Sequence, residues 1–400
     1  MAEFARRWQN GTIEDLNKCM LALLGTMITP GLINLGGGTP AKEALPLKEI
    51  RDIADDVFTI EKRGVEAFSY GSATGAQDFK EAIVKYLLAP KGLKDTTENI
   101  IVVAGSTEVM NLVSQTFLNP GDVVLVEDPT YLQSTIIFQL FGAKVVGIAM
   151  DENGMKMDEA EQKIKQYKPK LVYTIPTFQN PTGVTMSVKR RKRLAQLAGE
   201  YDFMVLEDDP YRDIRYSGEA LPPIKAFDTT NHVILAGSFS KIFSPGSRLG
   251  YAVATKEIIA KMADGQMCTN VHSPMESQVL AAEFFNRGYF PEHLKRVCTL
   301  YKERRDAMLH AIDAYFPKGC THTNPDGGMF VWINLPKNID AQALLKEAVA
   351  QTHVAYAAGN MFFVDPRQGK NTMRLCFTSL TPDKITLAVK KLGEFLCYNI

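Results

Sequence analysis

The stretch LVYTIPTFQNPTGVTMSVKRRKRLAQLAGEYDFMVLEDDPY, Leu171 to Tyr211, decides the fold class. It opens with an apolar run, continues with a helix-like stretch from Val188 to Tyr201, and ends with a second apolar run that begins at Phe203. Two strands joined by a helix form a β-α-β unit, in which the strands run parallel and the helix covers the sheet. Both runs are apolar almost throughout, which is typical of strands buried on both faces.

The same alternation extends to either side of this stretch. Further strand-like runs begin near residue 101 and at Val123, Lys144 and His232, and helix-like segments cover 107–118, 131–141 and 158–167. The pattern predicts an α/β fold with a mostly parallel central sheet and helices on both faces. Ligands of such sheets bind at the carboxyl ends of the strands.

The pattern changes near Pro291. A charged amphipathic stretch covers 292–315, strand candidates begin at Gly328 and Thr372, and helix candidates cover 341–350 and 382–395. We therefore expect a second, smaller α+β lobe, because 400 residues exceed the size at which one core stops growing. The predicted division is an N-terminal segment at 1–35 that packs on the small lobe or on a partner subunit, a large ligand-binding domain at 36–290, and a small C-terminal domain at 291–400.

Composition excludes several classes of protein. Lys+Arg 45 balances Asp+Glu 45, so the net charge gives no reason to expect nucleic acid or an anionic membrane as a partner. The six cysteines are scattered without zinc-site spacing, which predicts reduced thiols, a cytoplasmic protein and no metal site. The apolar run Cys19 to Ile28 is shorter than the ~20 residues of a membrane helix, so we interpret it as an amphipathic helix.

Polar residues follow two of the predicted strands. In GSTEV, Gly105 to Val109, the hydroxyls of Ser106 and Thr107 and free backbone N–H groups at a helix N-terminus suit a phosphate. An ordinary helix N-cap is the alternative interpretation. In FQNPTG, Phe178 to Gly183, Asn180 could direct its amide at a ring-bound oxygen, or the segment could be a simple turn.

The acidic segment EDDPYRD, Glu207 to Asp213, closes the strand that begins at Phe203. Its carboxylates could be solvated or could hold a divalent cation. Asp208 and Tyr211 are three residues apart, however, so a turn could direct both inward, where a buried carboxylate could keep a ring nitrogen protonated. We expect Glu207 and Asp209 to face outward.

The segment GSFSKIFSPGSRLGY, Gly237 to Tyr251, holds one lysine between serines. Lys241 can act as a nucleophile only when its amine is deprotonated, which requires burial or a nearby cation. Arg248 could supply that cation and could also clamp a phosphate, together with Ser238. A polar surface loop is the alternative interpretation.

These four segments, in this order and spacing, resemble the pyridoxal-phosphate-dependent class I/II aminotransferases of the aspartate aminotransferase fold type, fold type I. The resemblance runs from about Gly36 to the C-terminus. It is greatest to the kynurenine/2-aminoadipate aminotransferases, whose characteristic segments are similar to LGGGTP at 35–40, EDDPY at 207–211 and RLCF at 374–377. It implies pyridoxal 5′-phosphate as cofactor, a role in amino-acid metabolism and a homodimer.

The resemblance also implies a role for individual residues. Lys241 would form the internal aldimine and then move the proton between the substrate and the cofactor, while Asp208 would pair with the pyridinium nitrogen. Tyr211 and Asn180 would hydrogen-bond the phenolic oxygen. The remaining cofactor contacts would be the phosphate ligands and a ring-stacking residue: Ser106, Thr107, Ser238, Arg248 and Tyr131.

Other implied contacts involve the substrate and the partner subunit. Arg374 would bind the substrate α-carboxylate in a bidentate pair, with Asn180 beside it, although a strand arginine that reaches solvent is the alternative. Gly38 and Thr39 would line the substrate pocket. Tyr70, in FSYGSATG, would reach the phosphate of the neighbouring subunit.

The implied reaction moves an amino group from an α-amino acid to a 2-oxo acid, with 2-oxoglutarate as the expected acceptor, by a ping-pong mechanism. A β-eliminating lyase or a decarboxylase on the same fold is an alternative, because the cofactor contacts are shared. A MocR-like regulator is a non-enzymatic alternative, but about thirty residues before Leu35 are too few for a DNA-binding domain. The preferred amino donor does not follow from the sequence.

Overall fold

The computed structural model describes residues 31–399, together with Glu3, Ala5, Trp8, Glu14 and Lys18. The helix expected over Cys19 to Ile28 and most of the predicted N-terminal segment lie outside the described residues.

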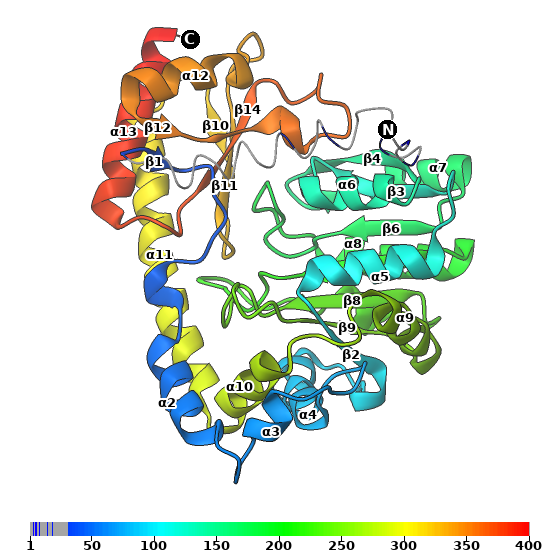
Figure 1. Cartoon of the computed structure of the whole chain (residues 1–400). Coiled ribbons are helices and arrows are strands. Elements are labelled where there is room, and N and C mark those ends of the chain that lie inside the picture. Colours follow the sequence, from blue (N-terminus) through cyan, green and yellow to red (C-terminus); the bar gives the residue numbers. More distant parts are fainter. Residues whose placement is uncertain are drawn as a thin grey trace.

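An eight-stranded sheet forms the centre of the larger unit (Figure 1). Its order is β2-β9-β8-β7-β6-β3-β4-β5. The pairs along β8, β7, β6, β3 and β4 are parallel, whereas β9 is antiparallel to both of its neighbours and β5 is antiparallel to β4. The α/β prediction with a mostly parallel sheet is therefore confirmed; β9 was not predicted. The strand bounds are β2 (Ile100–Val103), β3 (Val123–Asp128), β4 (Lys144–Asp151), β5 (Gly154–Met155), β6 (Leu171–Thr174), β7 (Met204–Asp209), β8 (Val233–Ser238) and β9 (Gly250–Val253).

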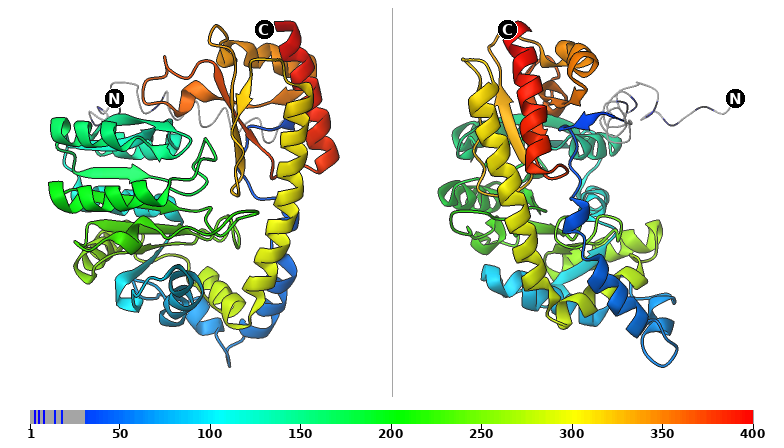
Figure 2. Two further views of the ribbon diagram at one scale, coloured as in Figure 1. Left: turned by 180° about the vertical axis from the view of Figure 1, so that it is seen from behind. Right: turned by 90° about the vertical axis from the view of Figure 1, so that its left-hand side faces the viewer.

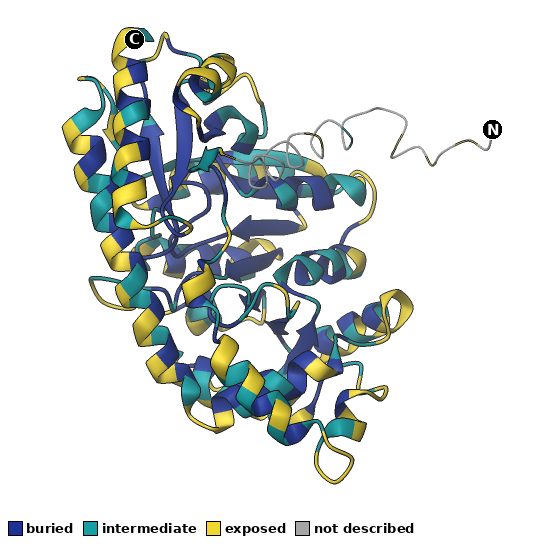
Figure 3. Ribbon diagram, turned by 60° about the vertical axis from the view of Figure 1, so that its left-hand side comes forward, coloured by how far each residue is buried: buried dark blue, intermediate teal, exposed yellow. Residues whose placement is uncertain are grey.

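Helices cover both faces of this sheet. Alternate residues of one strand enter different cores: Val205 packs with α7 and α8, whereas Leu206 packs in the core that includes α5, α6 and α9. This alternation follows from the two-residue period of a strand. The strands are buried along most of their length (Figure 3). The helices are α5 (Ser106–Phe117), α6 (Leu132–Leu140), α7 (Met157–Tyr167), α8 (Val188–Tyr201) and α9 (Lys256–Thr269).

A second, four-stranded sheet has the order β10-β11-β14-β13 and is antiparallel. The long helix α11 (Tyr289–Tyr315) runs beside it, and α13 (Pro382–Asn399) packs along α11 (Figure 2). The predicted boundary between 290 and 291 falls in the first turn of α11, and the division into domains stays a prediction. The strands are β10 (Thr321–His322), β11 (Phe330–Asn334), β13 (Ala357–Ala358) and β14 (Thr372–Cys376), and β1 (Ile33–Asn34) pairs with β12 (Val354–Ala355).

The remaining helices pack at one end of the central sheet or beside the second sheet. They are α2 (Leu47–Val57), α3 (Gly64–Ala67), α4 (Gln77–Ile83), α10 (Met275–Asn286) and α12 (Ala341–Thr352), and the 3₁₀ helix η7 (Gly359–Phe362) precedes β14. No helix in the described part of the chain is long and apolar enough to cross a bilayer.

Because β2, β3, β6, β7 and β8 all run in the same direction, their carboxyl ends meet at one edge of the sheet. The predicted polar segments follow these strands, so the fold brings them to that edge.

Candidate active site

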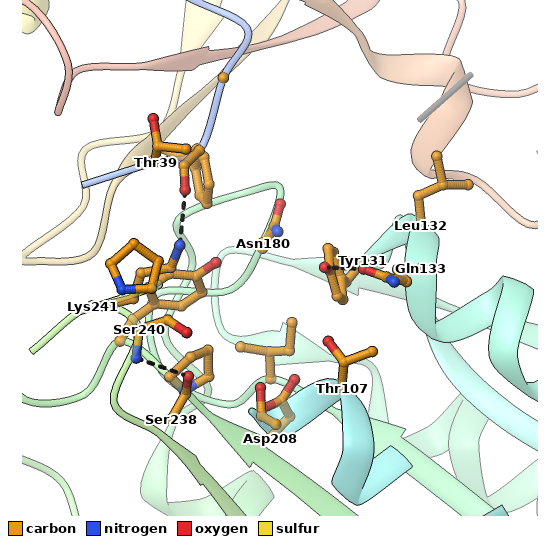
Figure 4. Close-up of a pocket in the computed structure, with 18 of the residues that line it drawn as sticks. Thr39, Thr107, Tyr131, Leu132, Gln133, Asn180, Asp208, Ser238, Ser240 and Lys241 are labelled. Carbon is orange, nitrogen blue, oxygen red and sulfur yellow. Dashed lines mark hydrogen bonds between the residues drawn. The ribbon is translucent and has the colours of Figure 1, made fainter. Parts of the chain in front are cut away.

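A cavity of about 360 Å³ lies at this edge, between the central sheet and the second sheet (Figure 4). Its volume is in the range of small-molecule sites. Every candidate residue from the sequence lines it except Tyr70. The predicted residues in its wall are Gly38, Thr39, Ser106, Thr107, Tyr131, Asn180, Asp208, Tyr211, Ser238, Lys241, Arg248 and Arg374.

Lys241 extends into this cavity from the turn after β8 (Figure 4). Its Nζ donates a hydrogen bond of 2.8 Å to the carbonyl oxygen of Gly38. Burial lowers the pKa of Lys241 to about 8; a neighbouring thiol, Cys376, opposes this effect, and the charges of Arg374 and Arg248 add to it. A substantial fraction of the amine is therefore neutral near physiological pH, as an amine nucleophile or base requires.

Asp208 lies at the end of β7, with a side chain only 2% exposed. Its Oδ2 accepts a hydrogen bond of 2.8 Å from the hydroxyl of Tyr173, whereas its buried Oδ1 has no partner among the described residues. Burial raises the pKa of Asp208 to about 7, against the opposing effect of the Tyr173 hydrogen bond. One oxygen of this carboxylate is thus free to meet a donor in the cavity.

The other two acidic residues of the strand are buried, so the expectation that they face outward is wrong. Glu207 accepts hydrogen bonds of 2.9 Å from the backbone N–H groups of Ile224 and Lys225, and Asp209 accepts one from Nε of Arg212. Arg212 also contacts Glu207, at 3.3 Å. Because β7 is a central strand with both faces covered, the residues on either side of Asp208 point into the opposite layer, where Arg212 neutralises them.

The N-terminus of α5 forms the next part of the wall. Gly105, with φ 88°, takes the N-cap position, so neither Ser106 nor Thr107 is the cap. Their hydroxyls make no hydrogen bond with any described residue. Arg248 donates to the carbonyl oxygen of Ala104 at 3.1 Å, and a Cβ at position 105 would lie 2.5 Å from its Nη2. The positive φ favours glycine at this position, and together these groups form a cradle that could hold an anion.

Arg374, on β14, is only 4% exposed, so the alternative of a solvent-facing strand arginine is wrong. Its Nη1 donates to Oδ1 of Asn180 at 2.8 Å and its Nη2 to the carbonyl oxygen of Gly36 at 2.6 Å. The guanidinium lies over the rings of Phe330 and Phe362, at 4.2 and 4.8 Å from their centroids. Its Nε is buried without a partner among the described residues.

Three further predicted residues complete the cavity. The hydroxyl of Tyr131 donates to Gln133 at 2.8 Å, and burial raises the pKa of Tyr131 to about 12. Tyr211 is buried edge-on to Phe330, with ring centroids 5.9 Å apart. Ser238 accepts a hydrogen bond from the backbone N–H of Ser240 at 3.2 Å.

Tyr70 lies outside this cavity. Its side chain is 90% exposed and contacts the ring of His272 edge-on. Within one chain the structure does not bring Tyr70 to the other candidate residues.

Several residues of the site were not predicted from the sequence. Tyr173, Gln133, Phe330 and Phe362 contact the predicted residues or line the cavity, but each reads as ordinary core or helix sequence. Only Tyr173 carried a signal, because a tyrosine hydroxyl in an otherwise apolar buried strand needs a partner. Among the described residues, no group of three or more His, Cys, Asp or Glu side chains could hold a metal ion.

Comparison with known families agrees with this geometry. Residues 30–392 match the family model for aminotransferase class I and II. The chain belongs to this family. Its cofactor is pyridoxal phosphate, which three features of the cavity fit: an amine whose pKa is lowered, a buried carboxylate with one unpartnered oxygen, and the cradle at the N-terminus of α5.

Relatives named as aminotransferases cover nearly the whole enzyme. It is 41% identical over 93% of its length to aromatic-amino-acid aminotransferase 1 of Thermococcus litoralis, covering 89% of that protein. It is 35% identical over 98% of its length to 2-aminoadipate transaminase of Thermus thermophilus, covering 95% of that protein. Among solved structures, Pyrococcus horikoshii kynurenine aminotransferase superposes with a TM-score of 0.92 at 38% identity, with 99% and 97% of the two chains covered.

A regulator is also similar to this chain. An uncharacterized HTH-type transcriptional regulator of Bacillus subtilis is 31% identical over 91% of this chain, and the match covers 73% of the regulator. The aminotransferases of Thermococcus litoralis and Thermus thermophilus are more similar to the chain, at 41% and 35% identity, and are matched over more of their own length. The protein is a pyridoxal-phosphate-dependent aminotransferase that acts on amino acids.

Proposed function

We propose that this aminotransferase moves the amino group of an α-amino acid to 2-oxoglutarate in two half-reactions of a ping-pong cycle. The observation that carries the proposal is that the Lys241 amine, with its pKa lowered to about 8, shares one cavity with the buried Asp208 carboxylate. Bound pyridoxal phosphate supplies an electron sink for the bond broken at the substrate Cα.

Lys241 is the proposed nucleophile and proton carrier. Its neutral amine would hold the cofactor at the aldehyde group by condensation with loss of water. Once a substrate amine has displaced it, the free amine would be the base that accepts the proton from the substrate Cα and the acid that returns it. The hydrogen bond from Nζ to Gly38 holds the amine at the substrate side of the cavity. Asp208 is proposed to keep the ring nitrogen protonated through its unpartnered Oδ1.

The remaining residues position the two ligands. We assign the phosphate to Ser106, Thr107, Ser238 and Arg248, because the first two present free hydroxyls at the helix N-terminus beside the guanidinium. Tyr131 would lie against the ring, and Tyr211 and Asn180 would bond its phenolic oxygen. Arg374 would bind the substrate α-carboxylate; its link to Asn180 joins the substrate and cofactor sites.

The side chain of the donor would lie beside apolar walls. Phe330, Phe362 and Leu132 line the cavity, and its basic residues among those described are Lys241, Arg248 and Arg374, each already assigned. Apolar walls favour aromatic or long side chains, and the relatives named for aromatic amino acids, kynurenine and 2-aminoadipate support that class of donor.

We also propose a homodimer in which Tyr70 completes the partner's site. In the sequence, Tyr70 follows three exposed apolar residues, Ile60, Val65 and Phe68, at 82%, 60% and 71% exposure. Apolar residues clustered on a surface mark protein interfaces. We keep a cytoplasmic location as a proposal, because every cysteine among the described residues is a free thiol.

The test of this function is a pair of lysine variants. The purified enzyme is expected to be yellow, to lose that colour with a suitable amino acid and to recover it with 2-oxoglutarate. Lys241→Ala should lose turnover by several orders of magnitude and keep the fold, whereas Lys189→Ala, on the exposed side of α8, should retain both. Full turnover by Lys241→Ala would show that Lys241 is not the nucleophile. Release of ammonia or carbon dioxide in place of amino transfer would favour the lyase or decarboxylase alternative.

A further inference from the structure

The hydroxyl of Tyr173 occupies a position that the proposed chemistry does not use. Tyr173 lies in β6, and its side chain is fully buried between the sheet and the helices that include α5 and α6. Its ring packs edge-on against the ring of Phe138 in α6, with the centroids 5.6 Å apart. Burial of a phenol hydroxyl in such an apolar layer lowers the stability of the fold unless the hydroxyl has a hydrogen-bond partner.

That partner is Asp208, through the 2.8 Å bond to Oδ2. Tyr173 pairs with Leu206 in the parallel register of β6 and β7, and Asp208 follows Leu206 by two residues. The two-residue period of the strand therefore places Tyr173, Leu206 and Asp208 on one face of the sheet. The fold places both ends of this hydrogen bond on adjacent strands.

The two oxygens of the carboxylate are consequently unequal. Oδ2 is held by Tyr173, whereas Oδ1 is buried without a partner among the described residues, and Asp208 lines the cavity. The hydrogen bond fixes the rotation of the carboxyl plane and stabilises the charged form of the group.

We propose that Tyr173 is a positioning residue that orients the Asp208 carboxylate, and keeps it ionised, so that its free oxygen meets the ring nitrogen of the cofactor. This inference rests on the proposed role of Asp208. Without the hydroxyl, Oδ2 would be a buried acceptor with no donor, and the carboxylate would rotate or take up a proton.

The experiment compares Tyr173→Phe with Tyr251→Phe. Tyr251 is an equally buried strand tyrosine whose hydroxyl makes no hydrogen bond with the described residues, so Tyr251→Phe controls for the loss of a phenol oxygen. The readouts are the dissociation constant of pyridoxal phosphate from the apoenzyme and the ¹⁵N chemical shift of the ring nitrogen in enzyme loaded with labelled cofactor. Removing one charge-assisted hydrogen bond should weaken cofactor binding by about tenfold.

The expected result is that Tyr173→Phe weakens binding and moves the nitrogen signal toward its unprotonated position, while Tyr251→Phe changes neither. An unchanged signal and affinity in Tyr173→Phe would overturn the inference. Asp208→Asn separates the two proposals: if Asp208→Asn moves the signal and Tyr173→Phe does not, Tyr173 alone is misassigned. If Asp208→Asn leaves the signal in place, the role of Asp208 fails as well.

A second comparison applies if Tyr173→Phe fails to fold because it leaves the buried Asp208 carboxylate without its donor, since Asp208→Asn removes that charge. The double variant Tyr173→Phe/Asp208→Asn is compared with Asp208→Asn alone, in which no carboxylate remains to be oriented. Equal affinities for the cofactor would support a role exercised through Asp208. A further tenfold loss in the double variant would show that Tyr173 acts independently and would contradict the proposal.

Discussion

At the scale of the residue, neighbouring acids in β7 have opposite surroundings. Each has one buried oxygen without a hydrogen-bond partner among the described residues, but Asp208 lines the cavity, whereas Asp209 is paired with Arg212 in the opposite layer. The sequence EDD predicts an inward Asp208, but it does not predict that Asp209 is buried as well. The strand period assigns each side chain to a face, and the packing on that face then decides its role.

Replacing these two aspartates should therefore have different consequences. Asp208→Ala should weaken cofactor binding and lower turnover strongly, with a small effect on apoenzyme stability. Asp209→Ala should lower the free energy of unfolding by about 3 kcal/mol, because it removes one partner of a buried ion pair. Urea unfolding of the apoenzymes and cofactor titration measure the two effects. A larger loss of stability in Asp208→Ala would reverse the assignment.

Lys241 predicts a pH dependence of apoenzyme stability. Its pKa is about 8 in the fold against an ordinary value of 10.5, so between these values the unfolded chain binds more protons than the folded one. Stability contributed by this group must therefore increase as the pH rises through the window. The unfolding free energy of the wild type should therefore rise relative to that of Lys241→Met by roughly 1 to 2 kcal/mol from about pH 8 to 9.5. One pKa unit corresponds to about 1.4 kcal/mol. Chemical unfolding at each pH measures it; a constant difference would contradict the lowered pKa.

At the scale of the element, the loop between β6 and α8 depends on two buried charged residues. Arg191, in α8, donates to the carbonyl oxygens of Met186 and Pro176 at 2.8 and 2.6 Å. From β3, Glu127 accepts from the hydroxyl of Thr174 at 2.6 Å and from the amide of Gln179 at 3.3 Å. Burial raises the pKa of Glu127 to about 7. These contacts hold the backbone on both sides of Asn180, so the geometry of the site depends on residues that do not line the cavity.

This anchoring predicts a contrast between adjacent arginines of α8. Arg191→Met should lower the free energy of unfolding by about 3 kcal/mol, because it leaves several buried carbonyl oxygens without donors. It should also speed amide hydrogen exchange in residues 176–186. Arg190→Met, which removes a partly exposed pair with Asp151, should cost about 1 kcal/mol or less and leave exchange in the loop unchanged. Equal effects of the two substitutions would refute the anchoring role.

At the scale of the whole molecule, the cavity is closed by contributions from both sheets. The segment 35–41 pairs with the smaller one: the backbone N–H of Cys376 donates to the carbonyl oxygen of Leu35 at 2.6 Å, and the hydroxyl of Thr378 donates to that of Thr39 at 2.8 Å. The same segment receives hydrogen bonds from Lys241 and Arg374. A change in how the two sheets sit would therefore move the substrate side of the cavity relative to the cofactor side.

The proposed dimer gives a prediction at this scale. Phe68→Glu should convert the enzyme to a monomer, because a charge would replace an apolar side chain that is 71% exposed in one chain. Leu387→Glu, at an exposed leucine of α13, should leave the assembly unchanged. Analytical ultracentrifugation distinguishes the species, and the monomer should bind cofactor more weakly because it lacks the partner's Tyr70. A dimer that survives Phe68→Glu with full affinity would exclude this surface.

From the sequence alone, the order of most strands and helices, the helices on both faces and the placement of polar segments at strand ends could be predicted, although β9 could not. The periodicity of apolar residues indicates which face of an element is buried, and turn residues indicate where strands end. Both patterns are local, so they can be recognised in the sequence. The sequence also predicted most of the cavity wall, since its polar segments follow parallel strands whose carboxyl ends share one edge.

Which side chains contact one another depends on how the elements pack in three dimensions. Arg374 and Asn180 are 194 residues apart, and Tyr173 contacts Asp208 from the neighbouring strand. Phe330, in the second sheet, and Phe362, in η7, pack against the Arg374 guanidinium. Glu207 and Asp209 can be buried because the Arg212 guanidinium pairs with both carboxylates. Such pairings arise from the packing of elements against one another, and no local pattern in the chain records which distant residue will fill the facing position.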